Sequence, residues 1–414
     1  MKVAFKTFGC KLNQAETNKF KIDFLKNGVS VVDLKEKPDL YIINACSVTK
    51  RAERKLRQEI YNIGRNYKGV YLIVTGCFTS NLKNNKKLKS LVDKWFPNTI
   101  KDDLVKRVLN IFHIKKKDSL LTDPPLKAEK NRAMVKIQDG CNNFCSYCII
   151  PYLRHEIISK DPKKIVREIN ALVEKGFKEV NLVGVNISLY SFKNKNLLSL
   201  LKYIVKNTNI SRIRISSLWP TFLNNEFINF IAKEKRICPY IHLSIQSGCD
   251  KLLKLMKREY TLKEVKKVIK RLKNNQISIG TDIIVGFPGE TKSDFYQTYD
   301  FVKWAGFINL HVFKYSPRPN TKAIQLKNKV SPFNKKKRSK ELRKLGQEIA
   351  ENEIKKYIKN KGKANILFEE RSGEYWLGKT KNYINVFLKT KKNLYNKIIK
   401  VNLIKSFKNG ILVK

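Results

Sequence analysis

The sequence predicts an α/β protein in three parts: a small N-terminal α/β domain with a parallel sheet, a central (β/α)6 partial TIM barrel, and a small C-terminal β-barrel. Strand-like and helix-like runs alternate in the first part, and the same alternation returns over a longer span after residue 133. The last part instead shows short strands separated by Gly and Asn turns. We therefore place the domains at residues 1–114, 127–357 and 358–414.

In the N-terminal part, strand-like runs at 3–8, 40–44 and 70–75 alternate with helix-like runs at 16–27 and 50–65. A cysteine follows each of these strands, namely Cys10, Cys46 and Cys77. Because the carboxyl ends of parallel strands lie at one edge of a sheet, we expect the three thiols to meet there. Buried cysteines that only fill space are the alternative, but the strand-end position of all three favours metal ligation.

The central part follows a polar, proline-bearing linker at 115–125. Its strands are predicted at 134–137, 180–185, 212–216, 240–245, 278–285 and 309–315, with helical segments between them. Six strands alternating with helices suggest a barrel or partial barrel, whose carboxyl-end loops hold the site. A charged, periodic segment at 333–359 predicts a connecting helix. The C-terminal strands are predicted at 364–368, 383–388, 397–403 and 411–414.

Composition limits the class of protein. The 414 residues carry 86 Lys and Arg against 35 Asp and Glu, a formal charge of +51 that indicates a polyanionic partner such as nucleic acid. An AT-rich genome produces a similar lysine excess without selection for binding. The 42% hydrophobic content excludes a disordered basic chain. No stretch is apolar enough for a membrane span or signal peptide, and eight scattered cysteines make no secreted disulfide scaffold, so we expect a cytoplasmic protein.

The strongest motif lies directly after the first strand of the central part. Cys141, Cys145 and Cys148 form the pattern C-x3-C-x2-C. Three thiolates on a tight loop can hold three irons of a [4Fe–4S] cluster and leave the fourth iron open to a substrate or cofactor. Zinc would need a fourth ligand at short spacing, and His155, which we expect in a surface loop, extends no usual zinc pattern. Cys238 and Cys249 match no ligand spacing.

This cysteine pattern, with Tyr147 before its last cysteine, resembles the signature of radical S-adenosylmethionine (SAM) enzymes. The rest of the chain resembles the methylthiotransferases of that superfamily. The matching segments are 7–14, 44–49 and 74–77 in the N-terminal part, 136–152, 281–290 and 311–319 in the radical SAM core, and 380–384 in a C-terminal TRAM domain. The resemblance therefore spans the whole chain.

Within the family, the segment Gly-Cys-Lys-Leu-Asn-Gln ending at Gln14 resembles the branch that modifies N6-threonylcarbamoyladenosine in tRNA. The branch that acts on isopentenyladenosine more often carries Gln and Met after the first cysteine, and a third branch modifies an aspartate of a small-subunit ribosomal protein. The resemblance thus implies a tRNA (N6-L-threonylcarbamoyladenosine-C2)-methylthiotransferase that acts at position 37, with the tRNA anticodon stem-loop as partner.

The resemblance also implies the cofactors. Cys141, Cys145 and Cys148 would carry the [4Fe–4S] cluster that binds SAM, and Cys10, Cys46 and Cys77 would hold a second, auxiliary [4Fe–4S] cluster that carries the sulfur. An electron donor of flavodoxin or ferredoxin type and a sulfur donor follow as partners. No catalytic acid or base is assigned. Carbon 2 of adenine is neither acidic nor electrophilic, and abstraction of its hydrogen atom by a radical needs no acid or base from the protein.

Candidate SAM contacts are Tyr147 and a set of small or amide side chains at predicted strand ends. That set is Gly184, Asn186, Ser216, Gln246 and Ser247. Gly and Ser in such loops also occur for turn reasons alone, so a packing role remains the alternative for each residue.

The sequence departs from the family at three places. Arg154, His155 and Glu156 stand where the family reads Arg-Gly-Arg, Lys160 stands for Arg, and Trp219 stands for Glu. These departures lie near expected substrate or SAM contacts and leave the expected cluster ligands unchanged.

The C-terminal tail, residues 358–414, holds 14 Lys and Arg against three Glu. Interleaved with them are aromatic residues that could stack unpaired bases or fill the core of the small barrel: Tyr375, Trp376, Tyr383 and Phe387. We expect this tail to bind tRNA and to be separable from the core. Its charge argues against the ribosomal-protein branch. A non-catalytic iron–sulfur RNA-binding protein and a zinc-binding nucleic-acid adaptor remain alternatives of a different class.

Overall fold

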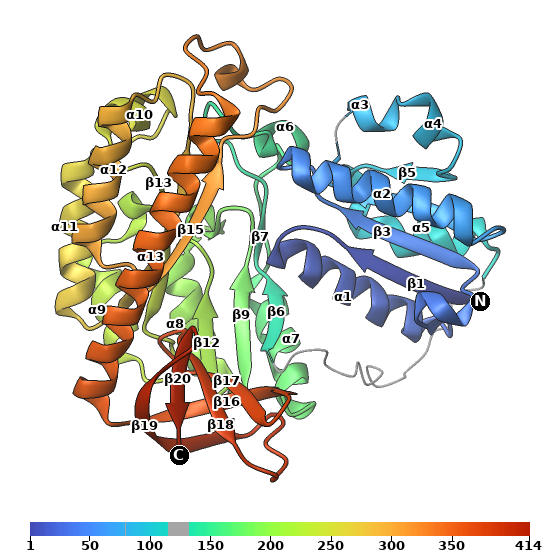
Figure 1. Ribbon diagram of the computed structural model, residues 1–414. Coiled ribbons are helices and arrows are strands. Elements are labelled where there is room, and N and C mark those ends of the chain that lie inside the picture. Colours follow the sequence, from blue (N-terminus) through green and yellow to red (C-terminus); the bar gives the residue numbers. More distant parts are fainter. Residues whose placement is uncertain (79, 115–131) are drawn as a thin grey trace. The chain divides into compact units, whose positions relative to one another are not determined.

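The computed structural model describes residues 1–78, 80–114 and 132–414, and the predicted linker at 115–125 lies outside them (Figure 1). The chain forms two compact units. The first holds Met1–Lys127, Asp139–Ile157 and Ser316–Ile324, and the second holds Ala128–Gln138, Ile158–Tyr315 and Gln325–Lys414. The three-domain boundaries stay a prediction.

The first unit is built on a five-stranded, wholly parallel sheet of order β2-β1-β3-β4-β5, as the alternation of strand and helix predicted. Its elements are β1 (Lys2–Thr7), α1 (Lys11–Lys26), β2 (Ser30–Val31), β3 (Leu40–Ala45), α2 (Lys50–Asn66), β4 (Tyr71–Gly76), α3 (Ser80–Lys83), α4 (Lys86–Lys89), β5 (Lys94–Phe96), η2 (Asn98–Asp103), α5 (Leu104–Ile111) and α6 (Ile150–Leu153). Apolar residues of α1 and α5 cover one face of the sheet, and those of α2 cover the other.

One helix boundary differs from the sequence prediction. The first helix was expected at 16–27, but α1 begins at Lys11, and Cys10 is its N-cap residue. The amide of Asn13, in the first turn, donates to the carbonyl oxygens of Phe8 and Ala45 at 2.9 Å each. These hydrogen bonds hold the helix start against two strand ends, a tertiary contact that local periodicity does not show. Strand β5 was also missed, because three residues give no periodic signal.

The second unit contains a six-stranded parallel partial barrel, which confirms the predicted fold class. Isolated bridges at Ile213–Ile237 and Leu218–Leu243 join its two three-stranded sheets. Its strands and helices are β6 (Arg132–Lys136), α7 (Pro162–Glu174), β9 (Glu179–Val183), α8 (Leu197–Asn207), β12 (Arg212–Ile215), α9 (Asn225–Lys233), β13 (Tyr240–Gln246), α10 (Asp250–Leu255), α11 (Leu262–Asn274), β14 (Ser278–Val285), α12 (Lys292–Ala305), β15 (Asn309–Lys314) and α13 (Pro332–Lys361). Two short strand pairs lie outside the partial barrel, β7 (Gln138–Asp139) with β8 (Ile158–Ser159) and β10 (Ser191–Phe192) with β11 (Lys195–Asn196).

The two faces of the barrel strands differ in chemistry. Alternate residues such as Ile241, Leu243 and Ile245 pack outward into the apolar core under the helices. The intervening residues, including Arg214 and His242, therefore face the inside of the barrel, which we call the lumen. A polar lumen is the surface at which strand-end residues can meet a ligand.

The tail forms a closed five-stranded barrel of order β16-β17-β18-β20-β19. Its strands are β16 (Lys363–Ser372), β17 (Tyr375–Lys379), β18 (Asn385–Lys389), β19 (Ile398–Phe407) and β20 (Gly410–Val413). The sequence prediction named four of these and missed β17. Trp376 is 8% exposed and Phe387 is 7% exposed. Trp376 packs in the interior of the small barrel, which excludes base stacking by its ring. Phe387 lies on the opposite face of its strand from the interior residue Val386 and packs against the rings of Tyr375 and Phe407.

Backbone carbonyls of the tail accept hydrogen bonds from buried arginines of the partial barrel. Arg212 donates to Lys379 at 3.1 Å and Asn365 at 2.8 Å, and Arg214 donates to Lys381 at 3.0 Å. Arg214 also pairs with Glu179 at 2.8 Å. The tail thus supplies acceptors for both arginines at this end of the lumen. That it is separable from the core stays a prediction.

We expect a chain that ends at residue 357 to unfold at a clearly lower temperature than the full chain. Truncation exposes Tyr240, Ile308 and Ile354, which pack in the same core as the small barrel, and each costs about 1.5 to 3 kcal/mol when exposed. Thermal unfolding monitored by circular dichroism measures the change. As a control, replacing the exposed Lys391 and Lys392 by Gln removes tail charge without touching this core. An unchanged melting temperature for the truncated chain would contradict the prediction.

No helix among the described residues has both the length and the apolar character needed to cross a membrane.

Candidate functional site: two cysteine triads

The first unit brings together Cys10, Cys46 and Cys77, which follow the adjacent strands β1, β3 and β4. Gly9, directly before Cys10, has a φ of +107°, and a Cβ atom built there would lie 2.9 Å from the Cys46 sulfur. Only glycine therefore fits at this position beside Cys46. Burial raises the pKa of the Cys46 thiol to about 12, and the nearby thiols of Cys77 and Cys10 contribute to this shift. Three thiols thus lie near one another at one sheet edge, where the sequence placed them.

The second triad lies in a tight loop of the same unit. The Cys141 amide donates to the carbonyl of Arg154 at 3.1 Å, and the Cys148 amide donates to that of Cys145 at 2.9 Å. Gly140 has φ of +77°, and a Cβ there would fall 1.7 Å from the carbonyl oxygen of Glu156. The backbone therefore requires glycine directly before the first cysteine of the loop.

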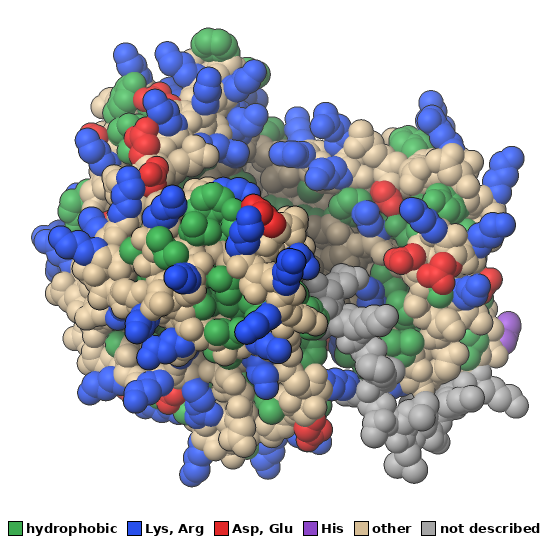
Figure 2. All heavy atoms as spheres, turned by 60° about the horizontal axis from the view of Figure 1, so that its bottom comes forward, with side chains coloured by type: hydrophobic (Ala, Val, Ile, Leu, Met, Phe, Trp, Pro, Cys, Tyr) green, Lys and Arg blue, Asp and Glu red, His purple; other side chains and the backbone are tan. Residues whose placement is uncertain are grey.

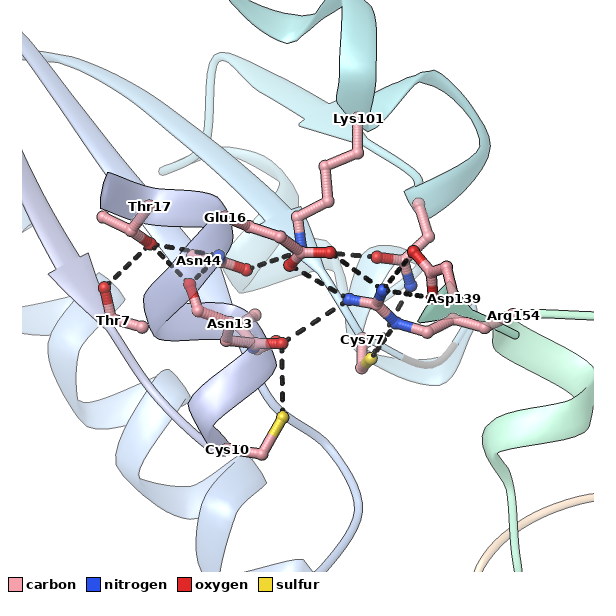
Figure 3. Close-up of polar contacts among 12 residues, drawn as sticks. Thr7, Cys10, Asn13, Glu16, Thr17, Asn44, Cys77, Lys101, Asp139 and Arg154 are labelled. Atoms are coloured by element: carbon pink, nitrogen blue, oxygen red, sulfur yellow. Dashed lines mark hydrogen bonds and ion pairs between the residues drawn. The ribbon is translucent and has the colours of Figure 1, made fainter. Parts of the chain in front are cut away.

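A buried network of charged side chains surrounds the first triad (Figure 3). The Arg154 guanidinium donates to the Cys77 sulfur at 3.2 Å, to Glu16 at 2.9 Å and to Asp139 at 2.8 Å. The Lys101 ammonium donates to Glu16 and, at 2.9 Å, to Asn44. The two cations, Arg154 and Lys101, balance the two carboxylates of Glu16 and Asp139. Arg154 also donates a hydrogen bond to the Cys77 sulfur. The network therefore places a positively charged hydrogen-bond donor beside the first triad.

The two cations of this network have pKa values shifted in opposite directions. Burial alone would lower the pKa of Arg154, but Cys77, Glu16 and Asp139 outweigh it and raise that pKa. The pKa of Lys101 is lowered, because its complete burial outweighs the attraction of Glu16. Arg154 is therefore the fixed cation beside the triad.

Arg154 also joins the two triads. Its carbonyl oxygen accepts the Cys141 amide, while its guanidinium donates to the Cys77 sulfur. Sequence reasoning noted this residue only as part of a departure from the family motif. The exposed position of His155, 60% for its side chain, agrees with the expected surface loop. Glu16 and Lys101 were missed altogether, although Asn44 at the end of an otherwise apolar strand was a usable signal.

Residues of both triads fit an iron–sulfur cluster. Each triad supplies three thiols, and a cluster held by three thiolates keeps one iron open. The buried Arg154 offsets the negative charge that such a cluster would bring to Cys77. Cys238 and Cys249, each 1% exposed, lie buried in the second unit.

The strand-end residues expected to contact SAM lie in the second unit, whereas Tyr147 lies in the cysteine loop of the first. Gly184 follows β9, and a Cβ there would lie 2.8 Å from the Gln138 side chain. The backbone amide of Asn186 donates to the Gln138 side chain at 2.9 Å, and the Asn186 side chain accepts a hydrogen bond from the backbone amide of Ser188. Gln138 thus holds the loop after β9.

The ends of strands β12 and β13 hold the other three candidate SAM contacts. Ser216 follows β12, and its amide donates to Leu182 at 3.2 Å. Gln246 ends β13 with φ of +78°, a strained conformation that turns the chain out of the strand. Ser247 is fully buried, and its hydroxyl lies 3.3 Å from that of Thr298. Ser247 therefore has a partner within the protein.

Trp219 is held by its neighbours. The Arg258 guanidinium lies 3.9 Å from the centre of its ring, and the Tyr260 ring packs edge-on against it. These contacts account for the aromatic residue at this departure from the family pattern.

Comparison with known proteins defines the class. Residues 135–302 match the radical SAM superfamily, and residues 2–96 match the Uncharacterized protein family UPF0004. The fold resembles the radical SAM methyltransferase TsrM from Kitasatospora setae, with a TM-score of 0.59, 15% identity, and coverage of 78% of this chain and 77% of that one.

Sequence relatives narrow the class. The threonylcarbamoyladenosine tRNA methylthiotransferase MtaB of Aquifex aeolicus is 38% identical, with 93% of this chain and 96% of that protein covered. MtaB of Bacillus subtilis is 32% identical, with 98% and 94% covered. The tRNA-2-methylthio-N(6)-dimethylallyladenosine synthase of Endomicrobium trichonymphae is 32% identical, with 97% of each covered. The chain belongs to the tRNA methylthiotransferase family of radical SAM enzymes.

Proposed function

We propose that this protein inserts a methylthio group at C2 of N6-threonylcarbamoyladenosine at position 37 of tRNA, next to the anticodon. The observation that carries the proposal is the pair of cysteine triads in one unit, joined through Arg154. A radical SAM enzyme that only generates a radical needs one triad, whereas sulfur insertion requires a second site to hold sulfur. The MtaB relatives support the threonylcarbamoyl substrate.

Each triad is proposed to hold one [4Fe–4S] cluster. Cys141, Cys145 and Cys148 would hold the cluster that binds SAM, and Cys10, Cys46 and Cys77 would hold the auxiliary one. When bound, these groups and SAM supply the radical that takes hydrogen from C2, the sulfur and the methyl group. An electron donor of flavodoxin or ferredoxin type and a sulfur donor are required as partners.

The chain's own residues have three tasks in this proposal. Arg154 orients Cys77 and compensates its charge, as a guanidinium hydrogen bond to sulfur does at other metal sites. Burial of Cys46 and Cys77, 9% and 4% exposed, limits water at the sulfur-bearing site. Tyr147, Gly184, Asn186, Ser216, Gln246 and Ser247 are proposed SAM contacts, of which Ser247 would have to give up its partner Thr298.

The surface supports tRNA as the partner. Figure 2 shows Lys and Arg side chains spread over the face that carries the C-terminal barrel, with few acidic side chains between them. Exposed lysines of that barrel include Lys389, Lys397, Lys400 and Lys405. Phosphate contacts by such side chains give affinity that falls steeply with salt. We place this activity in the cytoplasm.

The second candidate substrate is dimethylallyladenosine, because relatives named for it match at 32% identity over 97% of the chain. Both substrates are modified adenosines of tRNA, so the same two triads would serve.

Mass spectrometry of tRNA nucleosides from cells with and without this gene decides between the two substrates. We expect loss of the gene to convert 2-methylthio-N6-threonylcarbamoyladenosine into its unthiolated precursor and to leave isopentenyladenosine derivatives unchanged. Complementation by His155→Ala, at an exposed loop residue, should restore the product.

Three other outcomes would contradict the proposal. A change confined to the isopentenyl nucleoside would overturn the substrate assignment. A change in a ribosomal aspartate alone would overturn the tRNA proposal. No change in either would revive a non-catalytic RNA-binding protein.

A further inference from the structure

Three side chains with metal-binding atoms converge in the lumen of the partial barrel, in the second unit, which holds neither cysteine triad. The Asp282 carboxylate oxygen Oδ1 lies 3.0 Å from Nε2 of His242 and 3.0 Å from Nδ1 of His311. All three atoms lie within 4.8 Å of one another. Two ligands bound at about 2.0 Å to a tetrahedral ion lie about 3.3 Å apart, so the observed spacing is close to that of a metal site.

The strand register explains why these residues meet. Asp282 on β14 is paired directly with His311 on β15, so their side chains share one face. His242 on β13 is paired with Gly280, two residues before Asp282 and on the same face. A Cβ at Gly280 would lie 2.8 Å from Nδ1 of His242 and 2.1 Å from the Tyr240 hydroxyl. Glycine therefore leaves the space into which the His242 ring turns toward Asp282.

The surroundings match those of metal-binding histidines. The Tyr240 hydroxyl lies 3.1 Å from Nδ1 of His242, the ring nitrogen that faces away from Asp282. A metal-bound histidine commonly donates its other ring N–H to such a partner, which fixes the ring and the tautomer. His242 and Asp282 are largely covered, with 10% and 22% of their side chains exposed, whereas His311 is 56% exposed. The cluster is thus anchored on one side and open on the other.

We propose that His242, Asp282 and His311 bind one divalent transition-metal ion of the zinc type. Two imidazoles and one carboxylate are donors that suit zinc, iron(II) and cobalt(II), and the charge of Asp282 offsets part of the charge of the ion. Three protein ligands leave a coordination position for water or an oxygen ligand on the side of the exposed His311. This proposal is independent of the substrate of the enzyme.

The test uses the full chain, loaded anaerobically with iron and sulfide so that the cysteines are occupied, and then dialysed against zinc chloride and metal-free buffer. We expect about one zinc per chain by mass spectrometry, with only nitrogen and oxygen ligands in zinc X-ray absorption. Asp282→Asn and His311→Ala should each weaken zinc binding at least about tenfold. The other two histidines, His113 and His155, are exposed and supply matched alanine controls that should keep the metal.

Iron content and circular dichroism report whether each variant is folded. If a variant does not fold, His311→Gln is measured in its place. Zinc retained equally by His311→Ala and the wild type would overturn the proposal. Sulfur ligands in the absorption spectrum would place the zinc on cysteines and overturn it as well. No zinc retained by the wild type would show that the three residues form hydrogen bonds only.

Discussion

Replacing Cys46 with alanine is expected to abolish the methylthio product while reductive cleavage of SAM to 5′-deoxyadenosine continues. In the proposed function, radical formation would depend on the triad of the loop at 141–148, whereas sulfur insertion would also depend on the triad that contains Cys46. Iron should fall from about eight to about four per chain, because each triad is proposed to hold one four-iron cluster. Iron analysis and chromatography of the two products measure these changes.

A matched control is Cys238→Ala, which removes a buried thiol from the other unit that belongs to neither triad. That variant should keep all the iron and both activities. If Cys46→Ala lost SAM cleavage while its remaining cluster was intact, the proposed division of labour would be wrong.

Replacing Arg154 with leucine is expected to destabilise the first unit by about 3 to 5 kcal/mol, because it removes the buried guanidinium that pairs with the carboxylates of Glu16 and Asp139. Denaturant unfolding of the cluster-free protein, followed by hydrogen exchange of peptides from α1, measures the loss. Reconstituted protein should also release iron from the Cys77 triad faster than the wild type, because the hydrogen bond to that sulfur is gone.

The control for charge removal alone is Lys202→Ala, which breaks a pair with Glu226 whose side chains are 52% and 65% exposed. A pair this exposed contributes about 0.2 to 1 kcal/mol, so the control should change stability little. Equal stability of Arg154→Leu and the wild type would show that the buried network does not support the unit.

The sequence predicted the fold class and the position of the cysteines for local reasons. A strand followed by a cysteine repeats three times before residue 78, and parallel strands carry such positions to one edge whatever the contacts between helices. The spacing at 141–148 is equally local. Features that depend on period and turn residues could thus be predicted.

The charged network around the first triad could not be predicted in this way. Arg154 contacts Glu16 across 138 positions, and Lys101 contacts it across 85. Lysine is so frequent in this chain that one buried lysine gives no signal. The cluster of His242, Asp282 and His311 was missed because its members come from three strands that are far apart in the sequence.

The aromatic residues of the tail show a different limit on what can be predicted from the sequence. Period-two alternation in a short strand separates two faces but does not say which face is the interior. Trp376 proved to be inside a closed barrel, and Tyr383 packs against the Tyr240 ring at 4.9 Å between ring centres.

The dependence of the partial barrel on its tail sets an order of events during synthesis. Arg212 and Arg214 leave the ribosome 153 to 167 residues before the carbonyls that accept their hydrogen bonds. At 5 to 20 residues per second this interval lasts about 10 to 30 s, during which the nascent barrel lacks these acceptors and exposes apolar surface. A chain that stops before residue 358 lacks these acceptors, and we expect cells to degrade it faster than the full chain. The small barrel therefore supplies contacts that the partial barrel needs only after the partial barrel itself has been synthesised.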